Sequence, residues 1–493
     1  MYYVSTRNEK NRLTATDAII RGLAEDGGLL TPEVFPKLSQ NALETMKGMS
    51  YQQRAVYVMN GFLDEFSASE LSQFATRAYD QFDCPEVAPL HQVDEDTFCL
   101  ELWHGPTCAF KDMALQMLPL LLSASLEKRE EKKTACILVA TSGDTGKAAL
   151  EGFRDVNKTR ILVFYPKGGV APLQELQMTT QVGSNVAVCA VEGNFDDAQT
   201  GVKRLFSDPA LADKLKENGC FFSSANSINW GRVLPQIVYY ISAYCDMVQT
   251  GRVKNGDPVN VCVPTGNFGN ILAAYYAKIM GVPLGKLICA SNQNNVLTDF
   301  LKTGCYNRNR PFYQTLSPSM DILVSSNLER LLFALTGGAG GEVKDYMQKL
   351  ADDGSYQVSE PLRRKLETLF SAGFCDDAET EKTIARYWND KQYLIDPHTA
   401  VAFRVLEDYR SATGDRTPTV VVSTASPFKF CDGMLGALGA GQPAGGTDSI
   451  DQLTALTGVP APAPLEALKG KQPRFFDCVT KEQMADKVLE MLR

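Results

Sequence analysis

The sequence predicts an α/β fold with mainly parallel sheets, preceded by a mostly helical N-terminal region. Short apolar segments of strand character recur from about residue 98, and stretches of helical length separate them. Strands that alternate with helices form βαβ units with right-handed crossovers, which makes the sheet parallel. The predicted strands are FCLELW (98–103), ACILVAT (135–141), RILVFYP (160–166), NVAVCAVE (185–192), NVCVPT (260–265), KLICAS (286–291) and TVVVST (419–424).

The first 95 residues carry a different pattern, because amphipathic helical periodicity runs through 50–66 and 67–82. At 493 residues the chain is too long for one hydrophobic core. We therefore expect three domains: a mostly helical one over 1–95, and two α/β domains over 96–250 and 251–493. The Gly-rich stretch 436–448 is predicted to be a loop or linker.

The composition excludes several classes of function. Hydrophobic residues make up 44% and charged residues 22%, as in ordinary globular proteins, and no apolar run is long enough to cross a bilayer. The net charge of −9 disfavours nucleic acid or an anionic membrane as a partner. The 13 scattered cysteines and the absence of a signal-peptide pattern indicate a cytoplasmic protein with reduced thiols. With 3 scattered histidines, no metal site is expected.

Two loops follow predicted strands at the edge of the sheet where ligands bind in parallel α/β proteins. The first loop contains Ser142, Gly143, Asp144, Thr145 and Gly146, and Lys147 follows it. Small residues before a helix let backbone N–H groups point at an anion. The alternative is a tight turn in which Asp144 or Thr145 caps the helix. Lys147 favours the anion site, because a cation in a first helical turn opposes the helix dipole unless an anion lies nearby.

The second loop follows NVCVPT and contains Gly266, Asn267, Phe268, Gly269 and Asn270. The glycines allow close backbone approach, and the asparagines can cap a helix or donate hydrogen bonds. The loop lacks the lysine of a P-loop and is too short for the dinucleotide fingerprint. It suits a phosphate monoester better than ATP or NAD, and a simple Gly-rich turn is the alternative.

Lys111 lies in WHGPTCAFKD (103–112), directly before the apolar run that begins at Met113. An exposed lysine is a poor nucleophile at neutral pH, whereas a lysine beside Phe110 and Met113 has a lowered pKa and can form an imine. One such lysine alone is most simply a solvated charge. Together with two phosphate-suited loops, the polar turn STASPFKF (423–430) and few histidines, it indicates pyridoxal 5′-phosphate as the cofactor.

Six segments in this order closely resemble the threonine synthases of bacteria and fungi, and the resemblance covers nearly the whole chain. They are WHGPTCAFKD, ATSGDTGKAA, SANSINWGR, PTGNFGN, SPSMDILVSSNLERLLF and STASPFKF. The resemblance implies a fold-type II pyridoxal-phosphate lyase of threonine biosynthesis. Its reaction converts O-phospho-L-homoserine and water to L-threonine and phosphate. It also implies a small-molecule enzyme that is a monomer or weak homodimer.

The resemblance further implies roles for individual residues. Lys111 holds the cofactor and is the general base, 266–270 bind the cofactor phosphate, and Thr424 or Ser423 contacts the pyridine nitrogen. The substrate carboxylate is assigned to Ser142, Gly143, Asp144 and Thr145. The substrate phosphate is assigned to Lys147, Asn226, Ser227 and Arg232, with Lys429 a weaker candidate. No catalytic role is assigned to Trp103, His104, Asp112 or His398.

Two other functions stay open from the sequence. One is a phospholyase, dehydratase or sulfhydrylase of the same fold, which would lack the site for the γ-phosphate of O-phosphohomoserine. The other is a catalytically inactive protein that binds phosphorylated metabolites. Lys111 argues against this second function, because an inactive protein has no need of an imine-forming residue.

Overall fold

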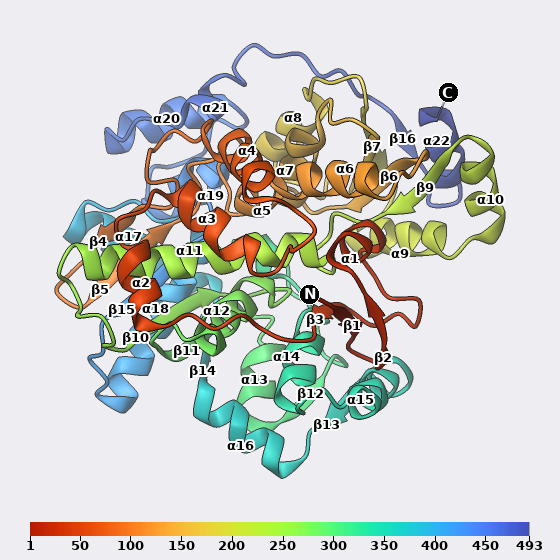
Figure 1. Cartoon of the computed structure of the whole chain (residues 1–493). Helices are drawn as coiled ribbons and strands as arrows, with labels where there is room; N and C mark the ends of the chain where they lie inside the picture. Colours follow the sequence, from red (N-terminus) through yellow and green to blue (C-terminus); the bar gives the residue numbers. More distant parts are fainter. Residues whose placement is uncertain (493) are drawn as a thin grey trace.

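The computed structural model describes residues 1–492 and contains two large sheets, one of five strands and one of six. In Figure 1 the five-stranded sheet lies at the upper right and the six-stranded sheet at the lower left, and the long helix α11 runs between them. Every strand pair in the five-stranded sheet is parallel, and so is every pair in the six-stranded sheet except β4–β5. The predicted α/β class with mainly parallel sheets is confirmed.

The five-stranded sheet has the order β16-β8-β7-β6-β9. Its strands are β6 (Thr134–Ala140), β7 (Thr159–Pro166), β8 (Val186–Val191), β9 (Cys220–Ser223) and β16 (Cys478–Val479). The helices that connect or flank these strands are α6 (Leu118–Lys128), α7 (Asp144–Phe153), α8 (Pro172–Thr179), α9 (Phe195–Phe206), α10 (Pro209–Glu217) and α22 (Met484–Met491). The C-terminal segment passes along the top of Figure 1 before β16 joins this sheet.

The six-stranded sheet has the order β14-β11-β10-β15-β5-β4. Its strands are β4 (Leu90–Gln92), β5 (Thr97–Glu101), β10 (Val259–Pro264), β11 (Leu284–Ser291), β14 (Phe370–Phe374) and β15 (Thr419–Ser423). Helical segments after β11 include α13 (Val296–Thr303), η1 (Pro318–Met320), α14 (Leu328–Leu335), α15 (Gly340–Asp352), α16 (Glu360–Leu369), α17 (Asp377–Lys391), α18 (Pro397–Thr413), η2 (Pro427–Phe430), α19 (Cys431–Ala437), α20 (Asp448–Thr457) and α21 (Ala463–Glu466). Strands β12 (Cys305–Asn307) and β13 (Ser355–Gln357) form a separate antiparallel pair, with η1, α14 and α15 between them in the chain.

The N-terminal region combines helices with a three-stranded antiparallel sheet. The strands are β1 (Tyr3–Ser5), β2 (Asn8–Leu13) and β3 (Leu30–Pro32), and the helices are α1 (Ala15–Arg21), α2 (Gln40–Met46), α3 (Tyr51–Asn60) and α4 (Ala68–Tyr79). Helices α3 and α4 begin in capping boxes at Ser50 and Ser67, which explains their sharp starts. The helices at 50–66 and 67–82 are thus as predicted, apart from their ends.

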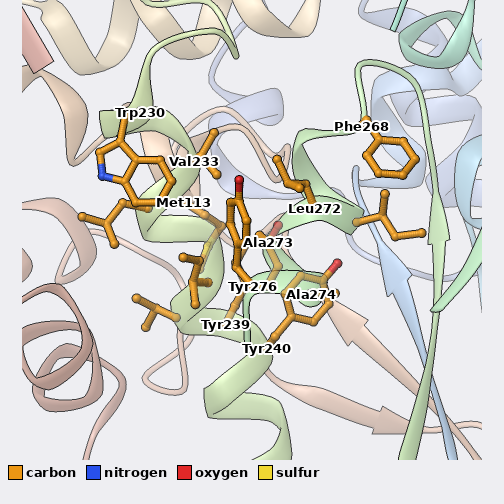
Figure 2. Packing of buried hydrophobic residues seen from close by; sticks show 14 of the residues in the cluster. Met113, Trp230, Val233, Tyr239, Tyr240, Phe268, Leu272, Ala273, Ala274 and Tyr276 are labelled. Atoms are coloured by element: carbon orange, nitrogen blue, oxygen red, sulfur yellow. The ribbon is translucent and has the colours of Figure 1, made fainter. Parts of the chain in front are cut away.

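The core between the two sheets is built on α11 (Trp230–Gln249) and α12 (Gly269–Met280), which pack side by side (Figure 2). The indole of Trp230 is fully buried and lies 6.0 Å from the Tyr276 ring, centroid to centroid. The hydroxyls of Tyr239 and Tyr240 both donate to Asn270 Oδ1, at 2.6 Å and 2.5 Å. The apolar contact between α11 and α12 thus continues into the two hydrogen bonds at Asn270. These hydrogen bonds hold the start of α12 against α11.

All seven predicted strands are present, because their apolar runs suit a strand buried on both faces. The other four strands of the two large sheets, β4, β9, β14 and β16, were not predicted, since LHQ, CFFS, FSAGF and CV are short. Strand β5 pairs with β15, and β16 pairs with β8, so each sheet joins segments far apart in the chain. The domain boundaries stay a prediction. Within residues 1–492, no helix has both the length and the apolarity that a membrane span needs.

Candidate active site

Lys111 lies at the start of the short helix α5 (Asp112–Leu115), and its side chain is buried. Its Nζ donates to Asp144 Oδ2 at 3.3 Å and to Ser319 Oγ at 3.1 Å, and it lies 5.3 Å from the centroid of the Phe110 ring. Burial lowers the pKa of the Lys111 ammonium, and Asp144 opposes this effect. The Lys111 amine thus has a lowered pKa and lies beside the Phe110 ring, as predicted, but its direct partners are the polar side chains of Asp144 and Ser319.

Asp144 is the buried anion of this site. Its carboxylate accepts from Lys111, from Lys429 Nζ at 2.9 Å and from Gln174 Nε2 at 2.7 Å. Burial alone would raise the pKa of the Asp144 carboxyl, but the ammonium groups of Lys429 and Lys111 hold it far below its ordinary value. Asp144 therefore stays ionised at any physiological pH and holds the two lysines close together.

The loop before α7 is shaped by Thr141, whose hydroxyl accepts from Gly143 N–H at 3.0 Å and Gly146 N–H at 2.9 Å. Gly143 has φ +143°, and a Cβ there would lie 2.3 Å from the Gln174 side chain, so glycine is required. The N-cap residue of α7, Gly143, has no side chain to cap the helix, and Thr141 accepts from the N–H groups of Gly143 and Gly146 only. The N–H groups of Ser142, Asp144 and Thr145 form no hydrogen bond to another described residue, which suits an anion, and the role of this loop stays a prediction.

The loop before α12 has the same features. Phe268 adopts a left-handed conformation with φ +64°, and no side chain caps α12. A Cβ on Gly266 would lie 2.6 Å from Ser319 O, so only glycine fits against the segment that contacts Lys111. The Nδ2 of Asn270 is buried and has no hydrogen-bond partner among the described residues, while its Oδ1 accepts from two tyrosines. A buried unpaired donor at a helix N-terminus calls for an acceptor such as a phosphate oxygen.

Arg232 is buried near the start of α11, and its charge acts on Lys111. Its Nη1 donates to Ala225 O at 3.0 Å, and among the described residues no carboxylate forms an ion pair with its guanidinium. Burial lowers the pKa of Arg232 to about 10. A buried cation without a counter-ion is costly unless an anion binds beside it.

The other candidates for the substrate phosphate differ in their partners. The ammonium of Lys147 pairs with Glu151 at 2.9 Å within α7. Glu151 therefore supplies the nearby anion that a cation in the first turn of a helix needs. Lys429 donates to Asp144 and to Thr107 O at 2.8 Å and is fully buried. Asn226 and Ser227 lie in the turn before α11, and a Cβ on Gly269 would lie 3.8 Å from Ser227 Cβ. The structure thus brings Ser227 to the second loop.

The segment after β15 runs beside the segment that leads to Lys111. Phe110 N–H donates to Thr424 O at 2.8 Å, and Leu102 N–H donates to Ser423 O at 3.0 Å. The hydroxyl of Ser423 accepts from Trp103 Nε1 at 3.1 Å and from Thr399 Oγ1 at 3.0 Å. The Ser423 hydroxyl is therefore engaged within the protein, whereas the buried Thr424 hydroxyl forms no hydrogen bond to another described residue.

The four residues left without a catalytic role have structural partners. Asp112 accepts from Thr107 N–H and Oγ1, and His104 lies between Asp83 and Glu101 with its ring stacked on Trp103. The Nε2 of His398 accepts from Ser319 N–H at 3.2 Å, and its Nδ1 contacts Asp396 at 2.7 Å. His398 thus supports the backbone that carries the Ser319 hydroxyl.

Sequence reasoning missed Thr141, Gln174 and Ser319. Ser319 belongs to SPSMDILVSSNLERLLF, a segment that carries the family resemblance but points to no single site residue. The resemblance gives Lys429 only as a weaker candidate for the substrate phosphate. A lysine among apolar and aromatic residues, as in SPFKFC, was the available signal that its ammonium is buried against a carboxylate.

Comparison with known proteins identifies the family. A family model described as "Threonine synthase N terminus" matches residues 2–79, and one described as "Pyridoxal-phosphate dependent enzyme" matches residues 82–425. Threonine synthase from Pseudomonas aeruginosa is 39% identical over 431 residues, which cover 87% of this chain and 89% of that protein. This chain belongs to the threonine synthase family. The predicted resemblance and the pyridoxal-phosphate enzyme class are thus confirmed.

Two further relatives place the chain within the threonine synthase family. The crystal structure of PLP-bound threonine synthase from Brucella melitensis has a TM-score of 0.89 and 38% identity, and covers 100% of both chains. The fold-type II architecture is confirmed by this match. Human threonine synthase-like 1 is 42% identical over 434 residues. They cover 86% of this chain, but the chain spans only 58% of that protein's length.

The residues present fit the cofactor of the threonine synthase family. Lys111 offers a buried amine, and the loop at 266–270 offers the uncapped end of α12 together with the unpaired donor of Asn270. Gly266 gives the close backbone approach that a phosphate needs. The prediction of pyridoxal 5′-phosphate is confirmed by the family, while the role of each site residue stays a prediction.

Proposed function

We propose that this protein converts O-phospho-L-homoserine and water to L-threonine and phosphate. The observation that carries the proposal is Arg232, a buried cation whose charge reaches Lys111 and which has no carboxylate partner among the described residues. This reaction needs a second anion site beside the reacting carbons, because the substrate brings its own phosphate. The relatives named threonine synthase support the same substrate.

Each part of the site has a proposed task. When bound, pyridoxal phosphate supplies the electron sink that makes carbanion chemistry at the substrate possible. The Lys111 amine removes the proton from Cα and then one proton from Cβ, so that phosphate can leave Cγ, and it later delivers a proton to Cγ. Asp144 and Ser319 orient this amine between the steps. Water then adds its hydroxyl at Cβ, and a proton returned to Cα completes threonine.

The anionic groups of substrate and cofactor are divided among the helix ends. We assign the cofactor phosphate to Gly266, Asn267, Phe268, Gly269 and Asn270, and the substrate carboxylate to the loop of Ser142, Gly143, Asp144 and Thr145. Within this loop the N–H of Gly143 already donates to Thr141. Arg232, with Asn226 and Ser227, receives the substrate phosphate. The hydroxyl of Thr424, and not that of Ser423, is assigned to the pyridine nitrogen, because Ser423 is already engaged.

The direct test combines purified protein, added pyridoxal phosphate and O-phospho-L-homoserine. We expect equal amounts of phosphate and threonine and a visible absorbance band from the lysine-bound cofactor. In Lys111→Ala both the formation of products and the absorbance band should be lost. Since a general base contributes roughly 10²–10⁴-fold, the variant should lose at least this much activity. A protein that releases no phosphate while binding the cofactor normally would contradict the proposed substrate.

The role of Arg232 has its own test, with Lys147 as the matched comparison. Arg232→Gln should raise KM for O-phospho-L-homoserine by roughly 10- to 100-fold, because a charge-assisted contact to phosphate contributes about 1.5–3 kcal/mol. Lys147→Gln should have a smaller effect, since its ammonium is paired with Glu151. An equal rise of KM in Arg232→Gln and Lys147→Gln would contradict the assignment to Arg232 and would favour a phosphate site beside Lys147 on α7.

A second candidate function is a phospholyase that releases 2-oxobutanoate, ammonia and phosphate from the same substrate. Contrary to the expectation from the sequence, this reaction also needs a site for the γ-phosphate, so Arg232 fits both functions. The candidate stays open because the relatives include human threonine synthase-like 1, at 42% identity, whose name does not state its reaction. Both reactions consume one water and release one phosphate, so phosphate release alone does not distinguish them. Measuring threonine and 2-oxobutanoate in the same reaction decides which function the protein has.

A further inference from the structure

Arg330 on α14 is fully buried, although it is a cation. Its Nε and Nη2 donate to Leu30 O at 3.0 Å and 2.8 Å, and Nη2 also donates to Ile228 O at 2.6 Å. Its Nη1 donates to Ser227 O at 3.3 Å and to Asn327 Oδ1 at 2.5 Å. The guanidinium therefore uses its whole fork of donors on carbonyl oxygens, four of the five contacts being to backbone.

These carbonyls belong to three segments that are far apart in the sequence. Leu30 is in β3 of the N-terminal sheet, and Ser227 and Ile228 are in the turn before α11. Asn327 precedes α14 and extends the connection, because its N–H and Nδ2 both donate to Asn267 O at 3.1 Å. Asn267 is in the loop assigned to the cofactor phosphate. One side chain thus joins the N-terminal sheet, the turn at 226–228 and the loop at 266–270.

The two loops approach each other at Gly269. A Cβ built there would lie 3.4 Å from Asn327 Nδ2 and 3.8 Å from Ser227 Cβ, so both neighbours stand at contact distance. Any change in the position of Ser227 or Asn327 changes the space around Gly269. A buried guanidinium loses its hydration and needs these carbonyl oxygens as replacement acceptors. The segments that supply the carbonyl oxygens are therefore held in fixed positions around Arg330.

We propose that Arg330 is a positioning residue that sets the separation between the loop at 266–270 and the turn at 226–228. The inference rests on the proposed roles of these two segments, in cofactor-phosphate and substrate-phosphate binding. Arg330 itself touches neither phosphate in this assignment. Its loss should therefore weaken cofactor binding and raise KM for O-phospho-L-homoserine, through the displaced loops.

The experiment compares Arg330→Met with Arg54→Met, a matched control. Arg54 is also buried and also donates to backbone carbonyls, of Met46, Lys47 and Ser242, and it joins α2 and α3 to the far part of α11. Its Nη1 also pairs with Asp246 at 2.6 Å, so its loss should destabilise the fold at least as much. Both variants should lower the unfolding temperature of the cofactor-free protein. Only Arg330→Met should weaken pyridoxal phosphate binding, by at least about 10-fold in an absorbance titration, and raise KM.

Two further variants keep the test decisive if Arg330→Met does not fold. Arg330→Lys keeps the charge but places its donors on one nitrogen, so it should also lose cofactor affinity. Asn327→Ala removes the side-chain bond to Asn267 O and should reproduce part of the loss. Unchanged affinity and KM in the Arg330 variants, or an equal loss in Arg54→Met, would overturn the inference. Failure of the wild-type protein to bind the cofactor would instead overturn the proposed function.

Discussion

Three charges determine the chemistry of the candidate site at the scale of single residues. Lys111 and Lys429 share the carboxylate of Asp144, and among these groups only Lys111 carries out chemistry in the proposed mechanism. Lys429 neutralises Asp144 when the amine of Lys111 loses its proton. Without Lys429, the buried carboxylate would depend on Lys111 alone and would hold that amine in its charged form.

The first prediction follows from this arrangement. In Lys429→Met the pKa of Lys111 should rise, because a repelling ammonium is lost, and in Asp144→Asn it should fall, because an attracting carboxylate is lost. Arg232 repels the Lys111 ammonium in both variants, so it does not alter the direction. The rate at which cofactor-free protein forms its visible absorbance band, measured against pH, should shift its midpoint upward in Lys429→Met and downward in Asp144→Asn. Shifts in the same direction would contradict the shared-carboxylate interpretation.

The second prediction concerns Asp112, next to Lys111 in the chain. Burial raises the pKa of the Asp112 carboxyl to about 6, although hydrogen bonds from Thr107 oppose this effect. A raised pKa in the folded state means that the stabilising contribution is present at low pH and is lost as pH rises through 6. Relative to Asp112→Asn, the wild-type protein should therefore lose roughly 2 kcal/mol of unfolding free energy between pH 4 and pH 8. Urea unfolding at several pH values measures the difference, which a pH-independent gap would refute.

At the scale of elements, the site is built twice from the same unit: a buried parallel strand, a tight loop and an uncapped helix. β6 leads into α7 and β10 leads into α12. The start of α7 lies near Lys111, since Asp144 accepts from its Nζ, and the loop before α12 lies against Ser319 O at Gly266. In the proposed assignment, the cofactor phosphate and the substrate carboxylate thereby obtain separate helix ends.

The third prediction compares two glycines in one of these loops. Gly266→Ala should lower the unfolding temperature of the cofactor-free protein by several degrees, because its Cβ would meet the backbone oxygen of Ser319 at 2.6 Å and overpacking costs about 1–3 kcal/mol. Gly269→Ala is the control, since its nearest neighbour is the end of the Asn327 side chain at 3.4 Å and alanine suits a helix start. Thermal unfolding of both cofactor-free variants measures this, and equal stability of the two would show that the Ser319 segment moves freely.

The strand–loop–helix units could be predicted from the sequence because each is local. The apolar run of NVCVPT, the glycines of GNFGN and the helical periodicity after them lie within about twenty residues. Ser319 and Arg330 could not be placed in this way. Their partners, Lys111, Leu30 and Ser227, lie far away in sequence, and the segment 308–327 has no periodic pattern that fixes its path. Contacts between distant segments depend on how the sheets and helices assemble.

At the scale of the whole molecule, the turn between β1 and β2 is tied to α14, the helix that carries Arg330. Arg7 donates to both oxygens of Glu329, each at 2.9 Å, and Thr6 Oγ1 donates to Glu329 Oε1 at 2.5 Å. The Glu329 side chain is only 6% exposed, whereas that of Arg7 is 26% exposed. The ends of this connection are more than three hundred residues apart in sequence, so it closes the fold around both loops of the site.

The last prediction uses this asymmetry of exposure. Arg7→Met should cost about 2–3 kcal/mol of unfolding free energy, because it leaves the Glu329 carboxylate buried with Thr6 as its main remaining partner. Glu329→Gln should cost less, since the half-buried Arg7 can turn toward water. The double variant should be more stable than Arg7→Met alone, because it removes the uncompensated charge, and denaturant unfolding of all four proteins gives the coupling energy. If the losses of unfolding free energy were additive, the ion pair would contribute nothing beyond its separate side chains. Apolar packing alone would then hold the turn between β1 and β2 on α14.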